Sequence, residues 1–201
     1  MKKLSLLKMV CIVFVFCAAM APALPAQVLT TLNSFDGTDG KGANGPVQGS
    51  DGNFYGTTEY GGSYLDGTVF KITPEGTLTT LYSFCSQQNC TDGEGPDAGP
   101  IQASDGNFYG TTAIGGAKTS YGTVFRITPS GTLTVLYNFC SESGCADGAG
   151  PRAALVQASD GNFYGTTWEG GAGTNCASYG CGTVFKIRPD GTLTTLYSFD
   201  V

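Results

Sequence analysis

One unit of about 55 residues recurs three times along this chain, which restricts the fold to an array of equivalent structural units. The stretch SDGNFYGTT begins each copy, at Ser50, Ser104 and Ser159. The stretch GTVF follows it, at Gly67, Gly122 and Gly182. Each copy then closes on TLTTLYSF or its variant TLTVLYNF, at Thr77, Thr132 and Thr192. The three repeats are expected to span residues 28–84, 85–139 and 140–199.

Each repeat predicts four short strands. In the second repeat they are expected at residues 100–104, 107–112, 122–128 and 132–139. The turn formers Asp105-Gly106 and Pro129-Ser130-Gly131 separate two pairs of these strands. The strands carry apolar residues on both faces, whereas a sheet with one solvated face would alternate. We therefore predict an all-β fold of tandem four-stranded antiparallel blades, similar to a β-propeller.

The number of repeats is low for a closed propeller, because propellers typically close with about 4–8 blades. A degenerate copy of the closing motif, VLTTLNSF, starts at Val28 and predicts one additional strand before the first repeat. We therefore expect an incomplete or open array. Three alternatives stay open: a fragment of a longer array, an open array, and a ring completed by another copy. Open strand edges would favour self-association.

The first 26 residues resemble an export signal. Lys2, Lys3 and Lys8 form a basic start, residues 9–20 are apolar, and cleavage is expected after Ala23 or Ala26. The apolar run is shorter than the roughly 18 residues of a spanning helix, although an uncleaved anchor is the alternative. We expect a signal peptide at 1–26, a single repeat domain at 27–201, and a secreted, cell-surface or periplasmic protein without membrane insertion after cleavage.

The charge of the mature chain limits its partners. Residues 27–201 keep seven basic and all sixteen acidic residues, a net charge of −9. Nucleic acids and anionic membrane surfaces are bound by basic patches, so neither is an expected partner.

Six cysteines remain after signal removal, and all have the spacing C-x4-C. The expected disulfide pairs are Cys85–Cys90, Cys140–Cys145 and Cys176–Cys181. Two pairs occupy the same loop of successive repeats, and the third lies in a five-residue insertion. Zinc binding is the alternative, but this chain has no histidine and its pairs lie in different repeats.

The chain offers few groups for catalysis, since it has no histidine and no free thiol is expected. The repeated Asp-Gly pairs at Asp51, Asp105 and Asp160 are typical of turns. An enzyme would instead use acids that are not repeated, and it would gather them in one cleft; the candidates are Glu59, Asp66, Glu94, Asp97 and Glu169. We expect no catalytic residues, with a secreted carbohydrate-active hydrolase or lyase as the alternative.

Calcium is the one cofactor that the sequence suggests. The loop Asp36–Asn44 concentrates oxygen ligands among glycines, but it lacks the spacing and terminal glutamate of an EF-hand. We therefore expect no cofactor or metal, and a shift in melting temperature on adding EDTA would support calcium instead.

Aromatic residues form the remaining candidate site. Most recur within strands, where the core explains them. Trp168, Tyr60 and Tyr64 lie in corresponding loops and are not repeated. Exposed loop aromatics stack on sugars or contact proteins, so these three are the candidate ligand-binding residues, and an extracellular glycan or protein is the expected partner.

The repeated pattern, with its GP[IV]Q, SDGNFYGTT, GTVFKITP and GTLTTLYSF segments, resembles the GloVer tandem repeat of bacterial choice-of-anchor surface proteins. The similarity covers residues 28–199. It implies an exported, surface-associated bacterial protein and supplies no catalytic residues. We expect a non-catalytic extracellular binding or structural module.

Overall fold

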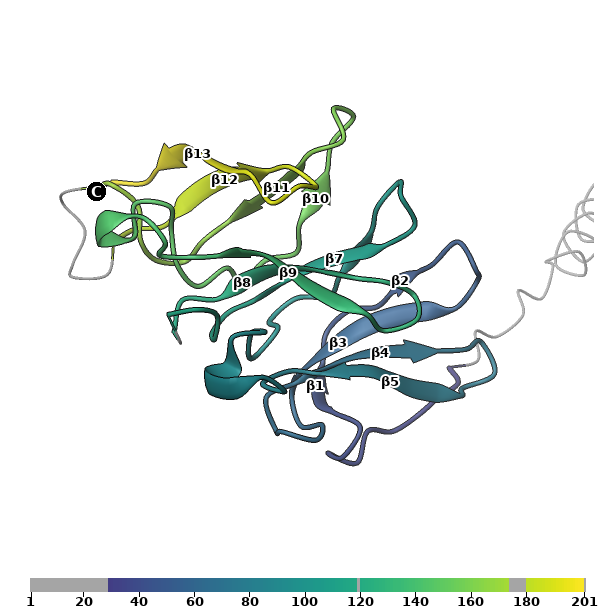
Figure 1. Cartoon of the computed structure of the whole chain (residues 1–201). Coiled ribbons are helices and arrows are strands. Elements are labelled where there is room, and N and C mark those ends of the chain that lie inside the picture. Colours follow the sequence, from purple (N-terminus) through teal and green to yellow (C-terminus); the bar gives the residue numbers. More distant parts are fainter. Residues whose placement is uncertain (1–28, 119, 174–179, 201) are drawn as a thin grey trace, which may run out of the picture. The chain divides into compact units, whose positions relative to one another are not determined.

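Three antiparallel sheets follow one another along the chain (Figure 1). The computed structural model describes residues 29–118, 120–173 and 180–200, so the predicted signal peptide at 1–26 lies outside the described residues. All three sheets belong to the compact unit Leu32–Val201. Within the described ranges, no helix is long and apolar enough to cross a bilayer.

The first sheet has the order β1-β3-β4-β5, and β2 also pairs with β3. Its strands are β1 (Lys41–Ala43), β2 (Val47–Gln48), β3 (Phe54–Tyr60), β4 (Thr68–Ile72) and β5 (Leu78–Ser83). The second sheet contains β6 (Ile101–Gln102), β7 (Phe108–Thr112), β8 (Thr123–Ile127) and β9 (Leu133–Asn138). The third contains β10 (Val156–Gln157), β11 (Phe163–Thr166), β12 (Thr183–Ile187) and β13 (Leu193–Ser198). These antiparallel sheets confirm the predicted all-β, blade-like fold.

The Asp-Gly pairs form the turns between the first two strands of each repeat. In the first repeat, Asp51 accepts hydrogen bonds from the amide of Asn53 (3.1 Å) and the hydroxyl of Tyr55 (2.8 Å). Asp105 and Asp160 have the same partners in their own repeats. These carboxylates therefore shape the turns, as their repetition predicts.

A β-bulge interrupts each outer strand at the same place. In the first sheet Val69 lies opposite Tyr82 and Phe70 lies opposite Thr80, so Leu81 is the additional residue. Leu136 and Leu196 hold this position in the other sheets. The bulge ends the simple alternation of the strand, and Leu81 directs its carbonyl oxygen toward the turn of the next repeat.

The sheets pack face to face through aromatic rings. Between the first and second sheets, Tyr55 stacks on Phe108 (3.9 Å between ring centroids) and Phe84 meets the edge of Phe125 (5.3 Å). The second and third sheets repeat these contacts with Tyr109 on Phe163 (4.1 Å) and Phe139 on Phe185 (5.2 Å). Strand residues on both faces are buried, as the sequence predicts.

The degenerate copy before the first repeat behaves differently from the prediction. Its described residues, 29–35, form no strand, and none of the described strands pairs with them. Phe35 nevertheless packs on Phe70 at 5.1 Å, as Phe84 packs on Phe125. The segment 32–36 therefore occupies the position that a preceding outer strand would take.

Candidate functional site

Two disulfides join Cys85 to Cys90 and Cys140 to Cys145, which is the local pairing that the spacing predicts. Cys176, the predicted partner of Cys181, lies outside the described residues, so that pair stays a prediction. Each observed disulfide loop docks on the next sheet through the carbonyl of its second cysteine. Cys90 accepts a hydrogen bond from the amide of Gly116, and Cys145 accepts one from Gly171, both at 2.9 Å.

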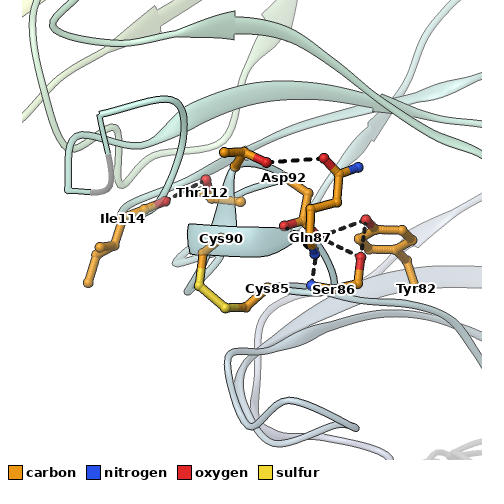
Figure 2. The surroundings of a disulfide bond; sticks show 9 residues. Tyr82, Cys85, Ser86, Gln87, Cys90, Asp92, Thr112 and Ile114 are labelled. Carbon is orange, nitrogen blue, oxygen red and sulfur yellow. Dashed lines mark hydrogen bonds between the residues drawn. A yellow bond between two sulfur atoms is a disulfide. The ribbon is translucent and has the colours of Figure 1, made fainter.

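A fully buried aspartate organises each disulfide loop, and Figure 2 shows the first of them. Asp92 accepts hydrogen bonds from the hydroxyl of Tyr82 (2.7 Å), the amide and hydroxyl of Ser86 (2.9 and 2.8 Å) and the amide of Gln87 (3.3 Å). Asp147 has the equivalent partners in the second loop. These two buried acids therefore serve the structure of the loops.

The acids that are not repeated are placed differently. Asp66, Glu94 and Asp97 line one pocket of about 280 Å³ at the junction of the first and second repeats. The lining is completed by Glu59, Tyr60, Gly95, Ala113, Ile114 and Arg152. Four carboxylates, one phenol and one guanidinium therefore share a small space. Glu169, the remaining acid of this group, is not among the lining residues.

Backbone hydrogen bonds between the repeats hold the pocket in place. The amide and carbonyl of Glu94 pair with those of Ile114, both at 3.1 Å. The amide of Gly95 donates to the carbonyl of Asp66 at 2.9 Å. Because Glu94 lies four residues after Cys90, the docked disulfide loop also determines where this carboxylate enters the pocket.

Burial and neighbouring acids raise the pKa values of several groups that line the pocket. Burial raises the pKa of Glu94, and the nearby Asp66 carboxylate raises it further. Burial also raises the pKa of Asp97, which Arg152 lowers in part and Glu59 raises. A hydrogen bond to Glu59 raises the pKa of the Tyr60 phenol. A raised carboxyl pKa means that the folded protein disfavours the ionised form of the group. Keeping such a carboxylate charged therefore lowers the stability of the fold, and groups of this kind cluster at functional sites.

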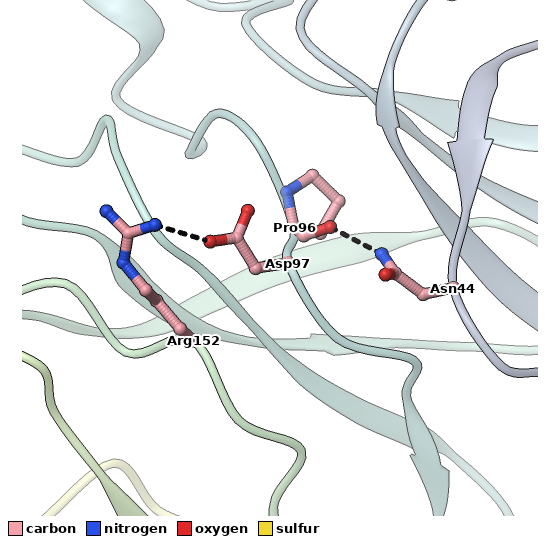
Figure 3. A network of polar contacts seen from close by, with 4 residues as sticks. All are labelled: Asn44, Pro96, Asp97 and Arg152. Atoms are coloured by element: carbon pink, nitrogen blue, oxygen red, sulfur yellow. Dashed lines mark hydrogen bonds and ion pairs between the residues drawn. The ribbon is translucent and has the colours of Figure 1, made fainter.

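Three polar side chains lie in a row, each of them shortly before the first short strand of its repeat, β2, β6 or β10 (Figure 3). Asn44, Asp97 and Arg152 stand at equivalent positions of the three repeats. Arg152 pairs with Asp97 at 3.3 Å, with the arginine side chain 56% exposed and the aspartate 19%. The Nδ2 group of Asn44 donates to the carbonyl of Pro96 at 2.7 Å. The row is therefore neutral, acidic and basic in turn, which makes each junction chemically distinct.

The three candidate aromatic residues lie at different positions relative to the acidic pocket. Tyr60 lines the pocket and is half exposed. Trp168 is 68% exposed and lies beneath the Arg152 guanidinium, 5.8 Å from its ring centroid, so it adjoins the pocket through that residue. Tyr64 is also half exposed but is not among the lining residues.

Arg152 is the site residue that the sequence reasoning missed. It replaces Asn44 and Asp97 within an otherwise repeated motif, and that substitution was the available signal. Glu59 was recognised only as an unrepeated acid, since its approach to Asp97 depends on how the repeats pack.

The structure places two groups of residues that could be considered for metal binding, one at the first disulfide and one in the 36–44 loop. Asp66, Cys85 and Cys90 lie within reach of a common ion, but both sulfur atoms belong to a disulfide and are not thiolate ligands. In the 36–44 loop, Asp36 accepts hydrogen bonds from the amide and hydroxyl of Thr38, and Asp39 accepts one from the amide of Asp36. Calcium binding in that loop stays the untested alternative to the expected absence of a metal.

The fold and the repeat define the class. Successive antiparallel sheets that pack face to face through a regular set of rings are β-propeller blades, so this is a blade-repeat protein of the propeller type. The chain belongs to the Gloeobacter/Verrucomicrobia repeat family, whose model matches residues 19–201. This membership confirms the resemblance to the GloVer repeat. No curated protein matches the sequence.

Solved structures support the fold. A protein named as a candidate gluconolactonase is 14% identical with a TM-score of 0.52, over 87% of this chain and 54% of its own. A candidate oxidoreductase (glucose dehydrogenase) from Thermus thermophilus is also 14% identical, with a TM-score of 0.46, over 76% of this chain and 46% of its own. This chain thus spans about half the length of these two structures. At such low identity the first comparison supports the propeller-type fold alone.

Proposed function

We propose that this protein is an exported, non-catalytic repeat module that binds a polyhydroxylated ligand, such as a glycan, in the acidic pocket. The observation that carries the proposal is the gathering of Asp66, Glu94 and Asp97 with Tyr60 at one junction of otherwise regular repeats. The residues that differ between repeats meet there, whereas the repeated ones account for folding.

The chemistry of the lining fits sugar hydroxyls. Ionised carboxylates accept hydrogen bonds from hydroxyl groups, and such charge-assisted bonds are stronger than neutral ones. Tyr60 and Trp168 add aromatic surface beside the acids, on which a sugar face can stack. The acidic lining and the net charge of −9 for residues 27–201 oppose binding of polyanions.

Export is part of the proposal. Disulfides persist in oxidising compartments, and the Cys85–Cys90 and Cys140–Cys145 bridges are typical of secreted proteins. The predicted signal at residues 1–26 agrees with this, and so does the exported character of the GloVer family. We therefore place the protein outside the cytoplasm, secreted or at the cell surface.

A glycan array probed with residues 27–201 tests the proposal. We expect retention on a defined set of glycans, with loss of signal for Asp97→Asn. Glu75→Gln, which alters an exposed turn acid outside the pocket, is the matched control and should bind as the unmodified protein does. No retained glycan would contradict glycan binding and leave a structural role, whereas equal retention by Asp97→Asn would contradict the acidic pocket as the binding site.

A hydrolase or lyase is the second candidate, and the pocket supplies an observation in its favour. Burial and the nearby Asp66 carboxylate raise the pKa of Glu94, and glycoside hydrolysis uses a carboxylic acid with a raised pKa as its general acid beside a second carboxyl group. Incubating the retained glycans with the protein and analysing the products separates the two functions. Products that disappear in Glu94→Gln while binding persists would establish the enzyme, and intact glycans would support the binding module.

A further inference from the structure

The backbone frame that holds the acidic pocket occurs a second time, between the second and third repeats. In the first frame, Glu94 pairs with Ile114 through both backbone groups. In the second frame, Ala149 pairs with Glu169 in the same way, at 2.8 and 3.0 Å. The same main chain therefore presents two sets of side chains. The other bonds of the frame recur as well, since Gly95 to Asp66 and Ala113 to Gly95 correspond to Gly150 to Tyr121 and Trp168 to Gly150.

The side chains on the second frame have a different chemistry. Trp168 takes the position of Ala113, so an indole ring lies where the acidic pocket has a methyl group. The second frame therefore offers aromatic surface where the first offers carboxylates. Three acids of the first frame are replaced by uncharged residues, namely Glu59 by Ala113, Asp66 by Tyr121 and Glu94 by Ala149.

The position of Trp168 faces the junctions in every repeat. Its two counterparts, Glu59 and Ala113, both line the acidic pocket, and both belong to sheets that are followed by another sheet. The placement of the indole ring at the second junction therefore follows from the repeat itself.

Arg152 connects the two junctions. Its guanidinium pairs with Asp97 at 3.3 Å on the side of the acidic pocket (Figure 3) and lies over the Trp168 ring, 5.8 Å from the centroid. The hydrogen bond to Asp97 uses one of the five N–H donors that a guanidinium carries. A ligand that leaves the acidic pocket past Arg152 therefore meets first a hydrogen-bond donor and then an aromatic ring.

We propose that Trp168 and Arg152 form a second subsite, which binds the next units of the glycan chain held in the acidic pocket. This inference rests on the proposed function and specifies its ligand as an oligosaccharide of two or more units. Sugar rings have hydroxyl groups at their edges and C–H groups on their faces, so the acids bind the edge of one unit and the indole stacks on the face of another. Stacked sheets lie roughly 10 Å apart, which exceeds the length of one sugar ring, so one unit does not contact both subsites.

A structural role of Trp168 would give a different result. A ring that serves only to hold Arg152 against Asp97 affects the acidic pocket, so its loss lowers the affinity for every chain length to the same extent. A subsite contributes affinity only to chains that are long enough to reach it. The dependence of affinity on chain length therefore separates the two roles.

Calorimetric titration of residues 27–201 with fragments of one and four units, prepared from the glycan that the array retains most strongly, tests the proposal. We expect the four-unit fragment to bind at least about tenfold more tightly than the single unit. Trp168→Ala should abolish this preference, and Trp168→Phe should retain part of it. Glu94→Gln should weaken the binding of both fragments alike and keep the preference.

Tyr64→Ala is the matched control, since Tyr64 is half exposed like Tyr60 but does not line the acidic pocket. It should keep the preference for the longer fragment. A thermal melt of each variant verifies folding, and Trp168→Phe keeps the test decisive if Trp168→Ala melts early.

Two kinds of failure are distinguishable. Equal affinity for both fragments, an unchanged preference in Trp168→Ala, or equal weakening of both fragments by that variant would overturn the second subsite and leave the acidic pocket as the glycan site. Retention of no glycan by the array would contradict the proposed function, and the second subsite with it.

Discussion

Gly110 illustrates how tightly single residues are specified in these blades. A Cβ atom there would lie 2.6 Å from Cζ of the Phe125 ring, which is fully buried. Gly56 and Gly165 face Phe70 and Phe185 in the same way. The glycine of the repeated FYGT segment therefore creates the space in which the core ring lies.

Gly110→Ala should destabilise the protein by about 1–3 kcal/mol, because the ring cannot move away within a filled core. Urea unfolding followed by circular dichroism measures the difference. Gly45→Ala is the control, since a Cβ atom there would meet nothing within 4 Å. Equal stability of the two variants would show that the Phe125 ring is free to shift.

At the scale of elements, the disulfide loops depend more on their buried aspartate than on their bridge. Asp147→Ala should cost about 3 kcal/mol, because it leaves the donors of Tyr137, Ser141 and Glu142 without their acceptor. Replacing both Cys140 and Cys145 with serine should cost about 2 kcal/mol, as expected for a short closed loop.

Thermal melts of both variants check this order. Glu142→Ala serves as the control, because only the backbone amide of this residue contacts Asp147. Burial alone would raise the pKa of Asp147, but hydrogen bonds from Tyr137 and Ser141 outweigh it and lower the pKa below 3.8. This stabilisation is therefore present above pH 3.8 and is lost as the pH falls further. A larger loss from the cysteine variant would contradict the order.

The turns and inner strands could be predicted because they depend on neighbours in sequence. Asp51 bonds to residues two and four positions later, so its role is visible in the motif itself. The bulge at Leu81 could not be predicted, because it is defined by the register with Val69 and Phe70. The strand expected from VLTTLNSF was wrong for a related reason, since a strand needs a partner that sequence does not show.

The pocket was predictable only in part. Asp66, Glu94 and Asp97 stand out because the repeats lack them elsewhere. Their convergence with Arg152, which follows 55 positions after Asp97, is a consequence of how three repeats pack. Comparison of aligned positions would have identified Arg152, but its pairing with Asp97 required the fold.

At the scale of the whole molecule, fully and partly buried tyrosines predict unfolding in alkali. Burial, together with the adjacent aspartates, raises the pKa of Tyr55, Tyr82, Tyr109 and Tyr137 to about 12. Since unfolded tyrosine titrates near 10, the folded state resists ionisation. This stabilisation is complete below about pH 10 and is lost as the pH rises through about 12.

Circular dichroism recorded against pH should therefore show cooperative unfolding between about pH 10 and 12. Tyr109→Phe removes one of the four groups and should make the loss of stability with pH less steep. Leu65→Ser, which removes no titrating group, should leave the steepness unchanged. Retained structure well above about pH 12 would contradict the assignment of these tyrosines as buried hydrogen-bond donors.

Glu94 connects stability with function. Its raised pKa means that ionised Glu94 opposes folding at neutral pH, so Glu94→Gln should melt at the same or a higher temperature. A lower melting temperature would show that the carboxylate serves structure. Perturbed carboxyl pKa values of this kind cluster at functional sites, which agrees with a role of the Glu94 carboxylate in ligand binding.

The most direct test of the acidic pocket as the functional site is calorimetric titration of the unmodified protein and Glu94→Gln with the glycan that the array retains most strongly. Loss of one charge-assisted hydrogen bond, worth about 1.5–3 kcal/mol, should weaken binding by about tenfold or more. Equal affinity of the two proteins would place the ligand elsewhere and contradict the account.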